Sequence, residues 1–248
     1  SNGVKEITLL GQNVNAYNYN TSKRKIKLSD LIFELQDLKD LKRIRYTTSH
    51  PKDMTNDLID CHNKVKKLMP FLHLPVQSGS NKILKNMNRK HTREEYLSTI
   101  RSLVKARPDI TFSSDFIVGY PGETEKDFND TLSLVKEVNF VNSFSFIYNP
   151  RPGTPASHLK EIDKETQKRR LIILQNLLEG IQIKENKKKV RKLKKALIEN
   201  KMKNQTNYFG RIDNLTPVVV SNANEKDVGK IIHVRIENYN RNTLFGVK

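Results

Sequence analysis

The chain has 248 residues, enough for one large domain or for a large domain followed by a small one. It shows no apolar stretch near 18 residues and no basic segment leading into an apolar one, so we expect neither a membrane span nor a secretory signal, and a cytoplasmic protein. The single cysteine excludes an internal disulfide, and the six histidines form no Cys/His cluster with the spacing of metal ligands.

The net charge of +18 favours a polyanionic partner such as nucleic acid. An AT-rich genome is an alternative source of part of this charge, because the sequence has 31 lysines against 14 arginines. The distribution is more informative, since residues 187–248 carry 15 lysines and arginines against five acidic residues. We therefore expect a separate basic module at the end of the chain.

Short apolar runs alternate with segments of helical periodicity over the first 150 residues. Helices are expected around residues 31–38, 58–68, 96–103 and 128–135. Alternation at this spacing is typical of βαβ units with a parallel sheet, so the sequence predicts an α/β fold, either a barrel or an open doubly wound sheet. The expected strands begin at Ile7, Ile44, Phe71, Ile110 and Phe144.

Short polar residues mark the starts of these helices. Thr92 and Thr124 are each followed three positions later by an acidic residue, which is the pattern of a capping box. Ser29 and Thr55 are the expected N-caps of the two preceding helices.

A loop rich in polar residues, glycine or proline follows each expected strand. In parallel α/β folds ligands bind at the carboxyl ends of the strands, so these loops are expected to surround one ligand site. They span residues 11–13, 49–51, 77–80, 119–124 and 149–153. In the fourth loop Gly119 and Gly122 would let the backbone approach a ligand closely. Glu123 and Thr124 either contact the ligand or serve as helix start and N-cap.

These loops hold no standard phosphate motif, because GYPGET fits neither the dinucleotide fingerprint nor the P-loop. His50 and His73 adjoin apolar strands and are expected as hydrogen-bonded core residues rather than catalysts. Cys61 lies in a helical segment, so we expect a buried thiol rather than a nucleophile.

The pattern changes after a long helix expected over residues 164–185. Short apolar runs divided by Asn, Asp and Gly are typical of a small β-barrel, so we divide the chain into residues 1–186 and 187–248. The run KKKVRKLKK at 187–195 is either a solvated linker or a phosphate-binding segment, and we favour RNA binding.

Six motifs resemble, in order and spacing, the methylthiotransferase branch of the radical S-adenosylmethionine (SAM) enzymes. The resemblance covers essentially the whole chain and implies a partial (β/α) TIM-like barrel followed by TRAM, a small OB-like β-barrel that binds tRNA. The motifs are LLGQNVNAY, IRYTTSHP, HLPVQSGS, LKNMNRKHT, SDFIVGYPGETEKDF and YNPRPGTPAS.

The resemblance also implies two 4Fe–4S clusters. One, on a C-x-x-x-C-x-x-C loop, reductively cleaves SAM to a 5′-deoxyadenosyl radical, and the second, in a separate N-terminal domain, supplies sulfur. Neither set of cysteines occurs in this sequence, so we expect it to begin just after the cluster loop and to be inactive alone. Because the cofactor performs the hard chemistry, no catalytic side chain is assigned.

LLGQNVN and TSHP most resemble members that add a methylthio group to carbon 2 of isopentenylated adenosine next to the tRNA anticodon. The alternatives are action on threonylcarbamoyladenosine in tRNA or on a ribosomal protein, and a catalytically inactive RNA-binding remnant. The expected partners are the tRNA anticodon stem-loop and an electron donor for cluster reduction. We expect a monomer that has no membrane contact.

The resemblance assigns the SAM-binding residues by position. Those at the ribose are an amide, a guanidinium and a carboxylate, a set suited to two vicinal hydroxyls. The residues expected to bind SAM are Gly11, Gln12 and Asn13 at the methionine end, Gln77, Arg89 and Asp115 at the ribose, and Ile117, Gly119 and Tyr148 at the adenine.

The expected RNA-binding residues begin with Arg151, which faces substrate phosphates or pairs with a carboxylate across the barrel mouth. Gly210, Arg211 and Asn214 match the TRAM pattern, while Ile212, Leu215 and Thr216 depart from it and put the exact RNA contacts in doubt. The full set is Arg151, Lys187, Lys188, Arg191, Arg211 and Asn214.

Overall fold

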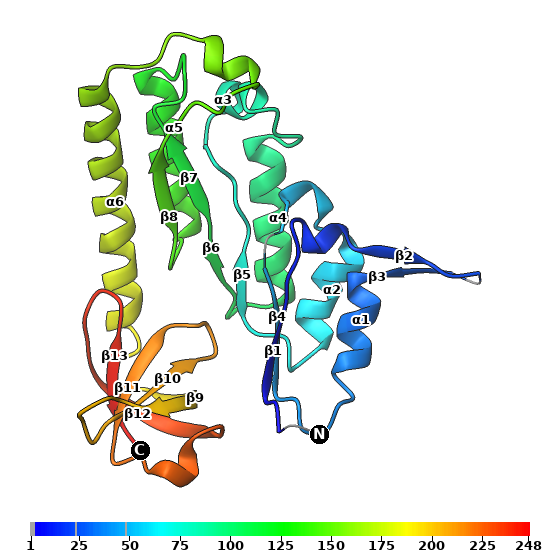
Figure 1. Ribbon diagram of the computed structural model, residues 1–248, viewed down its shortest axis with the longest axis vertical. Coiled ribbons are helices and arrows are strands. Elements are labelled where there is room, and N and C mark those ends of the chain that lie inside the picture. Colours follow the sequence, from blue (N-terminus) through cyan, green and yellow to red (C-terminus); the bar gives the residue numbers. More distant parts are fainter. Residues whose placement is uncertain (1–2, 23, 48) are drawn as a thin grey trace.

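Five parallel strand positions form the first part of the fold in the computed structural model, which describes residues 3–22, 24–47 and 49–248 (Figure 1). Thr48 of the TTSHP motif lies outside the described residues. The positions are β1 (Glu6–Leu9), β4 (Arg43–Tyr46), β5 (Phe71–His73), β6 with β7 (Thr111–Ser113 and Asp115–Val118) and β8 (Phe144–Ile147).

These strands pair in chain order. β1 pairs with β4, β5 with β6 and β7 with β8, always in parallel. Single bridges from Ile44 to Leu68 and from Gln77 to Phe116 join the three pairs. Within the described residues no pairing joins β8 back to β1, so the sheet is a partial barrel, and the expected α/β class is confirmed.

The helices expected between these strands are all present. They are α1 (Leu28–Leu35), α2 (Asn56–Lys64), α4 (Arg93–Ala106) and α5 (Glu125–Val138). Two elements were not predicted: the short helix α3 (Asn81–Asn86), and the hairpin of β2 (Asn18–Asn20) with β3 (Lys25–Lys27), which projects away from the barrel (Figure 1).

The capping boxes at Thr92 and Thr124 are confirmed, and Thr55 holds the N-cap position of α2. The prediction for Ser29 is wrong. The N-cap of α1 is Lys27, whose backbone N–H donates to the Asp30 carboxylate at 2.7 Å. Ser29 lies inside the helix and its hydroxyl donates to Asp57 at 2.6 Å, because β3 runs into α1 without the loop that the prediction assumed.

The helix α6 (Lys164–Lys187) runs alongside the partial barrel to the small β-barrel (Figure 1). That barrel is closed, with the strand order β10-β11-β13-β12-β9. Its strands are β9 (Leu193–Lys201), β10 (Tyr208–Ile212), β11 (Pro217–Ser221), β12 (Ile231–Tyr239) and β13 (Leu244–Val247), as the sequence predicts.

Two contacts hold the small barrel in place, one from the amino end of a parallel strand and one from α6. The buried Arg43, at the start of β4, donates to the carbonyls of Lys195 and Arg211, both at 3.0 Å. Asn186, near the end of α6, donates to the carbonyls of Asn240 and Arg241 at 3.1 and 3.0 Å. Within the described residues, no helix combines the length and apolar character needed to cross a membrane.

Candidate functional site

A cavity of about 880 Å³ lies at the carboxyl ends of the parallel strands. Ligands of α/β barrels bind at this end, because the loops there are free to carry polar groups. Six of the predicted site residues line it together, and they are Gln77, Arg89, Asp115, Ile117, Tyr148 and Arg151.

Asp115 is the first residue of β7 and lies at the centre of the polar side of this cavity. Its carboxylate is 3.5 Å from Nε2 of His73, whose other ring nitrogen is 2.9 Å from the Ser113 hydroxyl. Burial lowers the pKa of the Arg89 guanidinium, and the nearby Asp115 carboxylate opposes that shift. The cavity therefore presents an anionic acceptor beside a desolvated cationic donor.

Gln77 is held in an unusual backbone conformation, with a φ of 77°. Such a conformation is costly for a residue other than glycine and persists where the surroundings enforce it. Here the Gln77 N–H donates to the Asp115 carbonyl at 3.0 Å, and the Gln77 carbonyl accepts from Ile117 at 2.9 Å. No hydrogen bond to its side-chain amide is formed within the described residues, so this amide is available to a ligand.

An aromatic wall faces the polar side. The rings of Tyr120 and Tyr148 make an edge contact with centroids 4.9 Å apart. The Tyr120 hydroxyl donates to the Asn86 carbonyl at 2.9 Å, whereas the buried Tyr148 hydroxyl has no partner in the described chain. Buried hydroxyls are normally paired, so Tyr148 offers a hydrogen bond to an incoming molecule.

Gly119 is required by packing against α6. It has a φ of +73°, and a Cβ there would lie 2.6 Å from Cγ of Gln167. Its N–H donates to the Glu123 carboxylate at 2.8 Å, and Arg170 of α6 donates to the same carboxylate at 2.8 Å. Glu123 is thus a buried ion-pair partner rather than a helix start, while Thr124 is the N-cap of α5.

The predicted residues of the first loop do not line the cavity. Asn13 donates to the Asp53 carboxylate at 2.6 Å, and the Asn15 side chain bonds both backbone groups of His50. These contacts place Gly11, Gln12 and Asn13 over the loop that follows β4, at the same end of the sheet as Asp115 but outside the cavity itself.

A buried histidine at this end was not predicted. The ring of His91 contacts the ring of His50 at 5.6 Å, and neither nitrogen of His91 has a hydrogen-bond partner among the described residues. Burial, followed by the charges of His50 and Arg89, lowers the pKa of His91 to about 4. Its position in the polar run NRKHT gave no sign of burial, which results from α4 packing beneath it.

The predicted RNA-binding residues fall into two groups. Arg151 lines the cavity, and in the described chain no carboxylate lies within 4 Å of it. The others lie on or next to the small barrel. Lys187, Lys188 and Arg191 are exposed at the junction of α6 with β9, whereas the neighbouring Lys189 is buried, which lowers its pKa to about 8.

Two residues of the small barrel have intramolecular partners. Arg211 pairs with Glu199 and lies over the Phe209 ring at 5.2 Å. Asn214 is buried, and its side-chain oxygen accepts from the backbone and hydroxyl of Thr216. Asn214 therefore shapes the turn before β11.

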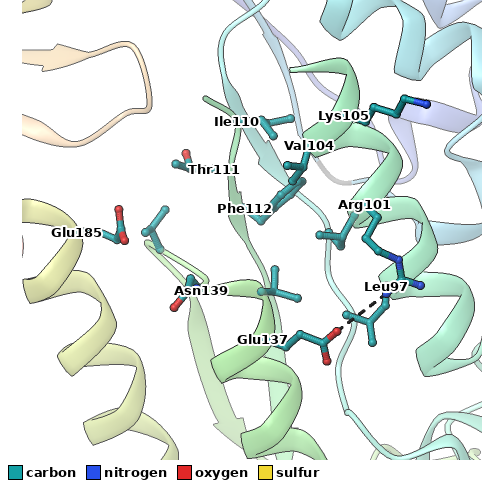
Figure 2. A pocket seen from close by; sticks show the side chains of 13 residues that line it. Leu97, Arg101, Val104, Lys105, Ile110, Thr111, Phe112, Glu137, Asn139 and Glu185 are labelled. Carbon is teal, nitrogen blue, oxygen red and sulfur yellow. Dashed lines mark ion pairs between the residues drawn. The ribbon is translucent and has the colours of Figure 1, made fainter. Parts of the chain in front are cut away.

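A second hollow, of about 500 Å³, lies between α4 and the end of α5. Figure 2 shows that its apolar side chains, such as Leu97 and Val104, lie among polar groups of which Arg101 and Glu137 pair with each other. None of the predicted site residues is among the described residues that line this hollow, whereas six of them line the first cavity, so the first cavity is the better candidate for a ligand site.

Cys61 is buried in α2, as predicted, and donates to the carbonyl of Asp57. Burial, with the neighbouring carboxylates, raises the pKa of its thiol to about 12. Within the described residues no group of three or more Cys, His, Asp or Glu is arranged to hold a metal ion. The chain therefore supplies no ligand set for an iron–sulfur cluster.

A partial parallel barrel with a ligand-sized cavity at the carboxyl ends of its strands is an architecture shared by many α/β enzymes. Residues 1–135 match the model of the radical SAM superfamily, and the chain belongs to this superfamily. Residues 187–248 match the TRAM domain. The family resemblance seen in the sequence motifs is thereby confirmed.

Relatives match along nearly the whole chain. A protein of Pelagibacter ubique (strain HTCC1062) named tRNA-2-methylthio-N(6)-dimethylallyladenosine synthase is 53% identical over 98% of this chain and 54% of its own length. Proteins of the same name from Rickettsia akari (strain Hartford) and Wolbachia pipientis subsp. Culex pipiens (strain wPip) are 51% and 48% identical, each over 99% of this chain and 56% of their own length. The chain thus spans about half the length of these relatives.

Among solved structures, coproporphyrinogen III oxidase (HemN) from Escherichia coli, described as a radical SAM enzyme, aligns with a TM-score of 0.49 and 18% identity. The alignment covers 75% of this chain and 49% of that one.

Proposed function

We propose that this chain is the SAM-binding barrel and RNA-binding barrel of a tRNA methylthiotransferase that modifies carbon 2 of isopentenylated adenosine next to the anticodon. The observation that carries the proposal is the cavity in which Gln77, Arg89 and Asp115 face Tyr148. The shared name of relatives at about 50% identity supports this choice of substrate.

The cavity residues fit the nucleoside part of SAM. The Asp115 carboxylate accepts from ribose hydroxyls, while the Gln77 amide and the Arg89 guanidinium donate to them. The backbone of Ile117 and the Tyr148 ring border the adenine, and Gly119 holds this wall in place through Gln167. Gly11, Gln12 and Asn13 approach the methionine end from the neighbouring loop. When bound, SAM would supply the radical chemistry of the reaction, with these residues holding its nucleoside.

The proposal assigns both 4Fe–4S clusters to parts of the enzyme outside this chain, because Cys61 is buried and is the only cysteine. The chain's own contribution is to bind and orient the nucleoside and to exclude water behind the tyrosine wall. An electron donor for the cluster, a cytoplasmic location and a monomeric state complete the proposal.

We assign residues 1–186 to the radical SAM barrel with its closing helix and residues 187–248 to the RNA-binding TRAM barrel, with the tRNA anticodon stem-loop as the partner. Arg151 is placed to meet a substrate phosphate at the cavity mouth. Lys187, Lys188, Arg191 and Arg211 supply charge on the small barrel, where phosphate neutralisation gives affinity without sequence preference. Asn214 contributes through the turn that it stabilises.

The first test is Asp115→Ala. Because hydrogen bonds to a charged group contribute about 1.5–3 kcal/mol, we expect SAM to bind roughly 30-fold more weakly, with the affinity for a stem-loop RNA within about twofold of the wild type. Calorimetric titration with SAM and fluorescence anisotropy with RNA measure the two affinities. Asp60→Ala, at an exposed site on α2, is the matched control. Equal losses of affinity for SAM and for RNA would show that Asp115 has a structural role.

The choice of nucleoside is tested in cells. Deletion of the gene should remove the methylthio group from isopentenylated adenosine in tRNA, as measured by mass spectrometry of tRNA nucleosides. If that nucleoside persists and the threonylcarbamoyl derivative loses its methylthio group instead, the proposed substrate is wrong.

A further inference from the structure

A cleft of about 730 Å³ separates the small barrel from the amino ends of the parallel strands, at the opposite end of the sheet from the SAM cavity. One wall comes from residues just before β1, β4 and β5, and the other from β9 and from the segment that leads into β12. Its charged lining residues are Lys5, Lys42, Arg43, Lys66, Lys67, Arg107, Lys195, Lys230 and Asp213.

Eight of these nine charged residues are basic, and three of the eight pair with carboxylates, namely Lys5, Arg43 and Arg107. In the part of the chain that the structure describes, Lys66, Lys195 and Lys230 form no ion pair. The ammonium groups of Lys42 and Lys67 donate to backbone carbonyls, so no carboxylate offsets their charge. Cations gathered in one cleft repel each other and together raise the local concentration of anions.

The cleft is held in shape by Arg43, which forms its floor. The guanidinium crosses from β4 to the carbonyls of Lys195 and Arg211 in the small barrel. The carboxylate of Glu6, at the start of β1, lies 3.6 Å from it. Because the buried Arg43 guanidinium bonds to both barrels, it is a structural clamp, and the exposed lysines around it are placed to bind a ligand.

The cleft and the SAM cavity are too far apart for one small molecule. Leu68 lines the cleft and Gln77 lines the cavity, nine positions apart on the run that crosses the sheet as β5. A fully extended chain rises about 3.3 Å per residue, so these two residues lie at most roughly 30 Å apart. A ligand that reaches both sites must therefore be long, and the basic lining of the cleft favours a polyanion.

We propose that this cleft binds the phosphate backbone of the base-paired stem of the same RNA whose modified nucleoside enters the SAM cavity. The inference rests on the proposed function, because the RNA substrate defines the polyanion. One wall of the cleft belongs to the TRAM barrel, so an RNA bound to that barrel can also contact the lysines of the opposite wall. Lys66, Lys195 and Lys230 are the principal contacts.

The test compares two triple variants of the full chain. The cleft variant carries Lys66→Gln, Lys195→Gln and Lys230→Gln, and the control carries Lys126→Gln, Lys136→Gln and Lys168→Gln on the exposed sides of α5 and α6. Both remove the same charge, from side chains that are exposed in each case. Thermal melting establishes that each variant is folded.

Anisotropy titrations with a stem-loop RNA at several salt concentrations give the result. We expect the cleft variant to bind at least tenfold more weakly, and its plot of log affinity against log salt to be shallower by about 2–3, since each duplex phosphate contact contributes about 0.9. The control should lose less than about twofold, and the single-stranded loop without its stem should bind the wild type and the cleft variant alike. Equal losses in both triples, or no loss in the cleft variant, would overturn the proposal.

The outcome for SAM separates this inference from the proposed function. The cleft variant should bind SAM as the wild type does. If SAM binds but the cleft variant behaves like the control, only the cleft proposal fails. If the cleft variant loses RNA affinity as expected, but the wild type does not bind SAM or Asp115→Ala leaves SAM affinity unchanged, only the proposed enzyme activity fails.

Discussion

The two ends of the parallel sheet differ in how they are built. At the carboxyl ends, Asp115, Arg89 and Gln77 combine one anion, one cation and one amide with an aromatic wall. At the amino ends the cleft is lined by eight basic residues and one acidic residue. A mixed set of groups distinguishes one small molecule from another, whereas a single sign of charge attracts any phosphate chain.

The ends also differ in the backbone that supports them. Gln77, Gly119 and Gly122 at the carboxyl ends all have positive φ, and the turn containing Gly119 is fixed by a buried ion pair between Glu123 and Arg170. In the cleft, Gly229 also has a positive φ, but Lys66, Lys195 and Lys230 do not. We therefore expect ligand affinity in the cavity to depend on precise packing, and RNA affinity in the cleft to depend on the number of charges.

The largest expected effect tests that dependence on packing. In Gly79→Ala, behind the cavity, the new Cβ would lie 2.6 Å from Cα of Thr131 and collide with the Asp130 carbonyl in α5. Overpacking of this kind costs about 3 kcal/mol, so urea unfolding should show a large loss of stability together with weaker SAM binding.

Gly180→Ala is the matched control, because nothing lies within 4 Å of the new Cβ in the middle of α6. Alanine is favoured over glycine in a helix, so this variant should gain up to about 1 kcal/mol. If Gly79→Ala unfolds at the same urea concentration as the wild type, Gly79 is not packed closely against α5 as the structure shows.

A smaller effect is expected at the clamp between the barrels. Arg43→Met leaves the carbonyls of Lys195 and Arg211 without their donor, at a cost of about 2 kcal/mol. Because the cleft walls are then free to separate, RNA affinity should fall while SAM affinity is retained. Arg45→Met is the control, since within the described residues Arg45 bonds to Glu6 and Thr8 of β1 and not to the small barrel. Equal RNA affinities for Arg43→Met and Arg45→Met would show that Arg43 does not hold the two walls of the cleft together.

The smallest effect is a pH dependence of stability. His62, 2.8 Å from the Tyr46 hydroxyl, has its pKa lowered by burial to about 3, and His91 at the cavity end has its pKa lowered to about 4. Unfolded histidine has a pKa near 6.5, so the stability from each neutral histidine is present above that pH and is lost as the pH falls toward the folded values.

Between pH 7 and pH 6 we expect His91 to account for a loss on the order of 0.5 kcal/mol in the free energy of unfolding. Urea titrations of wild type and His91→Phe across this range measure the difference. If the free energy of unfolding falls equally between pH 7 and pH 6 in the wild type and in His91→Phe, the histidine at the cavity end is not buried in its neutral form.

Local periodicity was sufficient for the strands and for most helices, because the alternation of apolar residues reflects burial directly. The cavity residues required the family motifs, since nothing in the local sequence distinguishes Asp115 from other acidic residues at strand starts. The Ser29 prediction failed because a cap depends on where the preceding strand ends.

Long-range packing explains which features could not be predicted from the sequence. Gly119 was assigned to ligand contact, yet its neighbour is Gln167, 48 positions away along the chain. The Arg43 contacts with the small barrel join residues 152 and 168 positions apart. Neither the cleft nor the buried Glu123–Arg170 pair has a signal in sequence spacing, because each depends on how distant elements dock.

The helix α6 is attached at both ends, through Gln167 and Arg170 to the turn at Gly119 and through Asn186 to the small barrel. At about 1.5 Å per residue it acts as a spacer of roughly 24 Å from Arg170 to Asn186. One inserted residue would rotate everything beyond it by about 100°. The exposed side chains of α6 can therefore vary, but its buried contact residues and its length cannot, because α6 fixes the distance between the turn at Gly119 and the small barrel.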